Sequence, residues 1–216
     1  MTDNVLIKAT PRAGDIVEPQ SVDLNAIGDV LVAQGLPAYT EMTRRGFGFQ
    51  VIATSALAGL VVRPSTTAAL TLYNGESTGG KSYIVDRIFT HCLVSDNVQG
   101  RFMLWACIHP AGMTAPASEL AASATNMTGM SGRTYSGNGV VNLALACTDN
   151  GWFPVSTSTD FEPTGVLPGA GIVVPIEGRL IVPPTGAISL QVVTSHTDAT
   201  YVTGLSWWEE QLNLVL

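Results

Sequence analysis

The last forty residues of the chain restrict its fold more than any other stretch. Residues 178–196 read Gly-Arg-Leu-Ile-Val-Pro-Pro-Thr-Gly-Ala-Ile-Ser-Leu-Gln-Val-Val-Thr-Ser-His, and a second apolar run extends from Tyr201 to Glu210. The β-branched and apolar residues are interrupted first by Pro-Pro-Thr-Gly and then by a short polar segment, both of which break or bend a strand. The pattern therefore predicts three strands joined by two turns at this end of the chain.

Apolar runs of similar length and composition precede this set from Gly46 onward. They are separated by residues rich in Gly, Pro, Asn and Ser, and they cover 46–52, 60–63, 68–73, 81–95, 101–109, 140–147 and 172–176. No helical segments alternate with them, which excludes a parallel α/β fold and favours an antiparallel two-sheet sandwich or jelly roll. The run 81–95 is apolar on both faces, so we expect it inside a two-layer structure, with 101–109 as its hairpin partner.

The chain is expected to contain an N-terminal arm at 1–45 and a β-sandwich domain at 46–216. Within the arm, apolar residues at helical spacing make Val22–Gln34 a candidate short helix, followed by the stop signals Gly35 and Pro37. Residues 110–138 are rich in Ala, Ser, Thr, Met and Gly, so we interpret them as a loop insertion in the domain, with a possible short helix at 117–124.

The composition indicates a surface that is covered by other protein chains. Apolar residues make up 46% of the sequence, whereas charged residues make up only 12%, roughly half the usual share of a soluble domain. The net charge of the chain is -7, and its 10 basic residues are scattered along the sequence. A nucleic-acid-binding surface needs clustered positive charge, so the sequence does not predict one.

The three cysteines and the N-terminal residues indicate the compartment in which the protein is made. Cys92, Cys107 and Cys147 have no CxxC spacing, and each lies in an apolar run, so we expect small buried thiols of a protein made in a reducing cytoplasm. The N-terminal residues do not resemble a signal peptide. The longest weakly polar run, 51–62, is too short for a membrane helix, so no membrane association is expected.

The sequence gives little sign of a metal site or a nucleophile. A metal site of the cupin type needs histidines and a carboxylate at close strand spacing. No second histidine lies at this spacing from His91, His109 or His196, so we expect ordinary half-buried or turn histidines. A nucleophile elbow, GxSxG at a strand-to-helix turn, is also not predicted, because a strand pattern follows the one match at 75–79.

Residues 75–82, Gly-Glu-Ser-Thr-Gly-Gly-Lys-Ser, fit the spacing of a phosphate-binding loop. Such a loop must open a helix, because the helix N-terminus supplies the backbone donors that hold phosphate. The residues that follow alternate as in a strand, so we predict a hairpin loop instead.

The closing Trp207-Trp208-Glu209-Glu210 contains paired acids beside aromatic rings, which is a feature of carbohydrate hydrolases. Adjacent strand residues point to opposite faces, so the two acids cannot act as a pair. We expect one Trp and one Glu to face inward and the other two outward. The sequence therefore predicts no catalytic, cofactor-binding or metal-binding residues and a protein that is not an enzyme.

Four segments resemble a known framework: Leu72–Glu76, Gly80–Asp86, Leu180–Gly186 and Ser206–Glu210. Over about residues 46 to 212 the pattern is similar to that of jelly-roll, tumour-necrosis-factor-like structural proteins of bacteriophage virions. The resemblance implies a homo-oligomer, often a trimer, with a capsid, decoration or fibre role. It carries over no catalytic residues.

Composition and resemblance together suggest a viral structural protein that is made in the host cytoplasm and assembles with itself and with other virion proteins. The alternative is a carbohydrate-binding surface module that uses exposed Trp152, Trp207 or Trp208. A cupin-like metalloenzyme is a third hypothesis.

Overall fold

The computed structural model describes residues 38–94, 100–117, 124–128, 134–159 and 170–212. All of them belong to the unit Ala38–Leu216. The candidate helix Val22–Gln34 and most of the candidate helix 117–124 lie outside the described residues.

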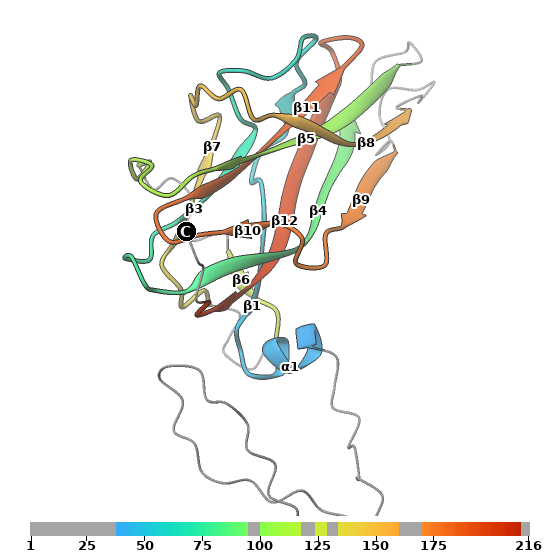
Figure 1. Ribbon diagram of the computed structural model, residues 1–216. Helices are drawn as coiled ribbons and strands as arrows, with labels where there is room; N and C mark the ends of the chain where they lie inside the picture. The colour runs from blue at the N-terminus through green and yellow to red at the C-terminus, as the bar shows by residue number, and fades with distance from the viewer. Residues whose placement is uncertain (1–37, 95–99, 118–123, 129–133, 160–169, 213–216) are drawn as a thin grey trace, which may run out of the picture. The chain divides into compact units, whose positions relative to one another are not determined.

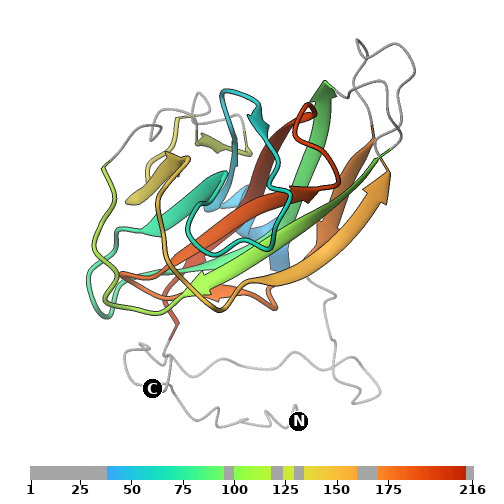
Figure 2. The ribbon, with the colours of Figure 1, turned by 90° about the horizontal axis from the view of Figure 1, so that it is seen from above.

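The described residues form two β-sheets packed face to face (Figure 1; Figure 2 shows the two layers from above). The first sheet has the order β10-β4-β12-β1-β6, with β9 also paired to β4 and β2 to β12; the second has the order β7-β3-β11-β5-β8. The strands of the first sheet are β1 (Gly48–Ile52), β2 (Leu57–Ala58), β4 (Ser82–Val94), β6 (Thr125–Asn126), β9 (Gly171–Pro175), β10 (Ile181–Val182) and β12 (Thr200–Glu210). Those of the second are β3 (Leu70–Asn74), β5 (Arg101–His109), β7 (Gly139–Leu143), β8 (Phe153–Thr159) and β11 (Ala187–Thr194).

This strand order is that of a jelly roll. Along the chain, β1, β3, β4 and β5 alternate between the two sheets, and β8, β9, β11 and β12 then do the same. All pairings between these strands are antiparallel. The predicted all-β sandwich of the jelly-roll type is therefore confirmed, and β11 and β12 at the C-terminal end lie inside the two sheets.

The core lies between the two sheets, and the period-2 alternation of the strands produces it. On β5, Phe102, Leu104 and Ala106 belong to the main core, as do Leu205 and Trp207 on β12. Full burial of one such large apolar side chain contributes about 1.5–3 kcal/mol to folding, so this alternation accounts for much of the driving force.

The outer face of the second sheet is covered as well. Strands β7 and β8 form its two edges, so residues 144–152, which we call the crossing segment, must pass across β3, β11 and β5. The inner face is filled by the core, and the crossing segment runs over the outer face. There it is bonded to residues 65–68, for example from the Cys147 N–H to the Thr66 carbonyl at 2.8 Å. A second small core, formed by Ala68, Cys107, Cys147 and Trp152, lies where the crossing segment packs on the sheet.

A helix that the sequence did not predict precedes β1. Helix α1 (Ala38–Arg44) begins after Pro37 in the sequence, a position that suits a helix start. The helix is capped by Gly46, whose φ of 83° is left-handed. The Gly46 and Phe47 N–H groups donate to the carbonyls of Thr43 and Met42, the bonding of a Schellman cap. Within the part of the chain that is described, no helix is long and apolar enough to cross a membrane.

The predicted hairpin between 81–95 and 101–109 is wrong. Strand β4 lies in the first sheet beside β12, and β5 lies in the second sheet beside β11. The predicted interior position of β4 is correct, because β12 flanks it on one side and β9 and β10 on the other.

The hairpin loop predicted at 75–82 is also wrong, because this segment links β3 in one sheet to β4 in the other. The buried side chain of Asn74 fixes the link by donating from Nδ2 to the carbonyls of Lys81 at 2.9 Å and Val182 at 3.1 Å. A strand, not a helix, follows the loop, as the alternation of its residues predicted.

Two further assignments differ from the sequence prediction. Residues 60–63 form no strand of their own: Leu60 makes an isolated bridge to Val193, and Val62 is 65% exposed. Strand β8 is not among the predicted runs, because Pro154 is typical of a turn and its Ser and Thr residues lack apolar alternation. It is an edge strand that pairs only with β5 among the described strands, and Pro154 sits beside a register shift, where proline is tolerated.

Candidate functional site

The three histidines lie apart. His91 is exposed on β4 in the first sheet, and His109 is buried at the end of β5 in the second. His196 follows β11 and is half-buried. The structure therefore does not bring the histidines together into a cupin-type site.

His109 instead lies in a cluster of polar and thiol groups on the outer face of the second sheet. Its Nδ1 is 2.9 Å from Asp149 Oδ2 on the crossing segment, and its Nε2 is 2.8 Å from Ser189 Oγ on β11. Ser189 Oγ in turn lies 2.9 Å from Thr71 Oγ1 and 3.8 Å from Cys147 Sγ. The cluster therefore joins three strands and the segment that covers them.

Local structure explains why these side chains meet. Ala106 and Ile188 point into the main core, so their neighbours Cys107 and Ser189, which are register partners, point to the outer face. Asp149 is fixed by an Asx turn, in which its Oδ1 accepts from the Gly151 N–H at 2.6 Å. Ligand atoms of Cys107, His109 and Asp149 all lie within 4.8 Å of one another.

Burial and the Asp149 carboxylate are the main influences on the pKa values in the cluster. Burial raises the pKa of Cys107 to about 12, and the negative charge of Asp149 adds to the effect. Burial also raises the pKa of Cys147. The pKa of Asp149 is lowered, first by the Gly151 N–H and then by His109, against the opposing effect of burial. In the absence of a bound cation, both thiols are therefore protonated beside an ionised carboxylate.

The contacts Ser189, His109 and Asp149 follow the order of a serine hydrolase relay. Ser189 is fully buried, however, and its Oγ also contacts Thr71 Oγ1. A substrate carbonyl cannot reach that oxygen in this structure. The arrangement therefore does not support hydrolysis.

The sequence did not identify this cluster, although a signal was present. The cluster contains two potential ligand pairs with the spacing i, i+2: Cys107 with His109, and Cys147 with Asp149. Cys107 precedes His109, and a pattern that considers only histidine pairs does not include it. The meeting of the two pairs depends on the path of the crossing segment, which the sequence does not give.

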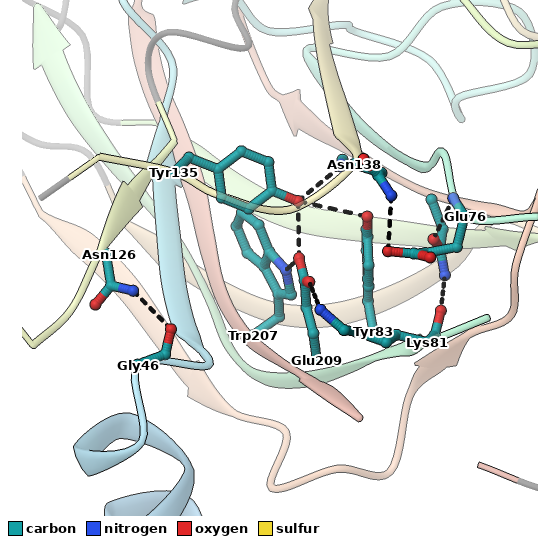
Figure 3. A network of polar contacts seen from close by, with 11 residues as sticks. Gly46, Glu76, Lys81, Tyr83, Asn126, Tyr135, Asn138, Trp207 and Glu209 are labelled. Carbon is teal, nitrogen blue, oxygen red and sulfur yellow. Dashed lines mark hydrogen bonds and ion pairs between the residues drawn. The ribbon is translucent and has the colours of Figure 1, made fainter. Parts of the chain in front are cut away.

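A second polar cluster lies inside one end of the sandwich (Figure 3). Glu209 is only 2% exposed, and its Oε1 accepts from Tyr135 Oη at 2.7 Å and from Trp207 Nε1 at 3.3 Å. Its Oε2 lies 3.6 Å from Lys81 Nζ. Trp207 is also buried, whereas Trp208 is half-buried and Glu210 exposed. The predicted alternation is thus confirmed, and the two acids do not form a hydrolase pair.

Two tyrosines complete this cluster. Tyr83 Oη lies 3.4 Å from Tyr135 Oη, which also accepts from the Gly139 N–H at 2.6 Å. Burial raises the pKa of both phenols, and the negative charge of Glu209 adds to the effect. Both remain protonated donors, so we interpret the cluster as a clamp that holds residues 135–139 against β12.

An open groove on the outer side of the first sheet has a volume of about 520 Å³. It is lined by Arg44 of α1, by Asp86 and Arg87 of β4, by Trp208 and by Met127, among others. Trp152 and Trp207 are 3% and 1% exposed. Of the three tryptophans considered for glycan binding, Trp208 alone has a substantially accessible ring.

An apolar row crosses the outer face of the same sheet. Ile52, Gly204, Phe89 and Val173 are register partners on β1, β12, β4 and β9. Ile52 is 47% exposed and Val173 56%. A Cβ atom at Gly204 would lie 2.4 Å from the Phe89 ring, so the absence of a side chain there allows Phe89 to lie across the strand.

Comparisons with known proteins identify no family for this chain. No family model matches it, and neither does any curated protein. Among solved structures, it is similar to a chain of deformed wing virus, a honeybee pathogen, with a TM-score of 0.27 and 10% identity over 100% of this chain and 66% of that one. A chain of Mud Crab Dicistrovirus gives a TM-score of 0.23 and 12% identity, over 100% and 94%. Both TM-scores are too low to indicate a shared fold, so the jelly-roll assignment depends on the strand order alone.

Proposed function

We propose that this chain is a non-enzymatic structural protein of a virion, which assembles with copies of itself and with other virion proteins. The observation that supports this best is the apolar row Ile52, Phe89 and Val173 on the first sheet, in which Ile52 and Val173 are exposed and Phe89 is half-buried. The jelly-roll topology agrees with the proposal, although such folds serve many functions.

The surroundings of the row resemble the centre of a protein interface. The adjacent register row consists of Gln50, Ser206, Arg87 and Pro175, in which Arg87 is the only charged residue. Arg87 is bonded to Asp86 at 3.2 Å, so its charge is locally compensated. The central parts of stable interfaces are apolar and poor in charge, and a subunit surface with these properties is stabilised by covering it with another chain.

The finer parts of the proposal rest on the sequence resemblance and the composition. They are a bacteriophage origin, a trimeric or higher assembly, a capsid, decoration or fibre role, location in the virion, and a subunit contact made by the arm 1–45. With a net charge of -7, the chain is expected to contact other proteins and not nucleic acid.

Assembly can be tested with one pair of substitutions. We expect light scattering of the purified protein to show a defined oligomer, and Val173→Glu to weaken its association at least tenfold, because an unpaired carboxylate would be buried in the interface. Val62→Glu is the matched control: Val62 is 65% exposed and lies outside the row, so this variant should associate like the wild type.

Two outcomes would contradict the proposal. A wild-type protein that stays monomeric over the whole concentration range would remove the self-assembly role. An unchanged oligomer in Val173→Glu would show that the apolar row is not the contact surface.

The groove beside Trp208 supports a second candidate function, carbohydrate binding. A half-buried indole near Arg44, Arg87 and Asp86 combines a stacking surface with hydrogen-bonding groups for hydroxyls. If this function is correct, a glycan screen should yield ligands that quench Trp fluorescence, and Trp208→Ala should abolish their binding. A screen without ligands, or unchanged binding by Trp208→Ala, would reject it.

A further inference from the structure

We propose that Cys107, His109, Cys147 and Asp149 bind one zinc ion, which fastens the crossing segment to strand β5. This inference is independent of the proposed virion role. It concerns the second sheet, whereas the apolar row and the Trp208 groove belong to the first.

The ligands come as two pairs from two parts of the chain. Cys107 and His109 are two residues apart on β5 and therefore project from the same face. Cys147 and Asp149 have the same spacing on the crossing segment, which is bonded in place at both residues: their N–H groups donate to the Thr66 and Ser65 carbonyls at 2.8 and 3.1 Å. Each pair is thus held by backbone hydrogen bonds before any metal binds.

The distances suit a small tetrahedral ion. Ligand atoms of Cys107, His109 and Asp149 lie within 4.8 Å of one another. Cys147 packs against Cys107 in the second small core, and its Sγ is 3.8 Å from Ser189 Oγ, the group bonded to His109. Zinc bonds of about 2.0–2.3 Å place tetrahedral ligand atoms about 3.5 Å apart. Shifts of about 1 Å would bring Cys107, His109 and Asp149 to this spacing, whereas Cys147, which lies outside the 4.8 Å group, must move further to complete the site.

The donor set favours zinc over harder cations. Two sulfurs, one imidazole nitrogen and one carboxylate oxygen are ligands that zinc accepts, whereas calcium and magnesium require mostly oxygen. Cys107 is fully buried, His109 is 5% exposed and Cys147 7%. A site this closed, with four protein ligands, is typical of structural zinc.

His109 is already oriented for this role. Its Nε2 is bonded to Ser189 Oγ, which is bonded in turn to Thr71 Oγ1, and its Nδ1 faces Asp149. A metal-bound imidazole usually has its second nitrogen held in this way. On binding, Nδ1 would coordinate zinc, and Nε2 would carry the ring proton and donate it to Ser189 Oγ. The two thiols would release their protons to solvent and bind as thiolates.

An entry path is also present. A pocket of about 300 Å³ is lined by His109 and Cys147 together with residues 110–113, Ala146 and Thr148. The Asp149 side chain is 24% exposed. A hydrated ion can therefore approach His109 and Cys147 through this pocket, and Asp149 from its exposed side.

The experiment measures metal content and cobalt spectra of the full chain, purified without a metal-binding tag. We expect about one zinc per chain by elemental analysis, and a sulfur-to-cobalt charge-transfer band after exchange with Co²⁺. Loss of an outer partner alone can weaken metal binding 10–100-fold, so Cys107→Ser and Cys147→Ser should each lower zinc affinity at least about 100-fold. Cys92→Ser is the matched control, because Cys92 is an equally buried thiol in the first sheet.

The outcomes distinguish a specific zinc site from adventitious zinc binding. Zinc retained equally by Cys107→Ser and the wild type would be adventitious and would overturn the proposal. So would a wild-type protein that, after incubation with Zn²⁺ or Co²⁺ and removal of free ion, holds no metal and shows no thiolate band. If Cys107→Ser does not fold, Asp149→Asn, at the exposed side of the site, serves as the second variant and should show the same loss relative to Cys92→Ser.

Discussion

Replacing Trp207 by Ala should lower the free energy of unfolding by about 3–5 kcal/mol, the usual cost of removing a large aromatic side chain from a core. Trp207 is 1% exposed. Its ring centroid lies 5.8–6.1 Å from those of Phe49, Tyr83 and Tyr135. The substitution leaves a cavity among these rings and removes the Nε1–H donor to Glu209.

The matched control for this prediction is the next residue. Trp208 is half-buried and points to the outer side of the sheet, so Trp208→Ala should cost clearly less, within about 1.5 kcal/mol. Urea unfolding followed by circular dichroism measures both values. Equal losses in the two variants would contradict the inward and outward assignment. If Trp207→Ala does not fold, Trp207→Phe should show a smaller loss, because it keeps much of the ring packing.

The alternation of Trp207 to Glu210 was predictable because it depends only on neighbouring residues. Strand geometry requires adjacent side chains to face opposite sides, and a continuous run such as 200–210 leaves few other interpretations. The same local reasoning located β11 and β12 at the C-terminal end and gave the two-sheet class.

Strand partners were less predictable, because they are set by contacts across the whole chain. Ser206 pairs with Arg87, and Ser189 pairs with Cys107. These partners are far apart in the sequence, and the local residue pattern does not indicate which strands pair. The hairpin between 81–95 and 101–109 followed from proximity in sequence, whereas the core requires these two strands in opposite sheets. Strand β8 was missed for a different reason: it is an edge strand, and its Ser and Thr residues lack the apolar alternation of a buried strand.

The candidate metal site shows the same division between local and tertiary information. The pair Cys107 and His109 could be found from its spacing on a predicted strand. The position of this pair beside Cys147 and Asp149 could not be predicted. It results from the path of residues 144–152 over the outer face of the second sheet. A crossing of this kind is fixed by which edges β7 and β8 occupy, and these positions depend on the complete topology.

The second large effect is expected at Glu209. Glu209→Ala should lower the free energy of unfolding by about 3 kcal/mol, because the buried Tyr135 hydroxyl and Trp207 N–H would both lose a charged acceptor. The Lys81 ammonium would also lose its partner, but its side chain is 40% exposed and water can solvate it. Glu209→Gln keeps the size and one acceptor oxygen, so we expect a smaller loss of about 1 kcal/mol.

Glu210 provides the control for this prediction, since it is the adjacent acid and is exposed. Glu210→Ala should change the free energy of unfolding by no more than about 0.5 kcal/mol. Because Trp207 donates to Glu209, the combined variant Trp207→Phe with Glu209→Ala should lose less stability than the two single variants added together. Strict additivity would mean that the hydrogen bond contributes little, and a loss in Glu210→Ala as large as that in Glu209→Ala would show that the buried carboxylate is not what holds residues 135–139 against β12.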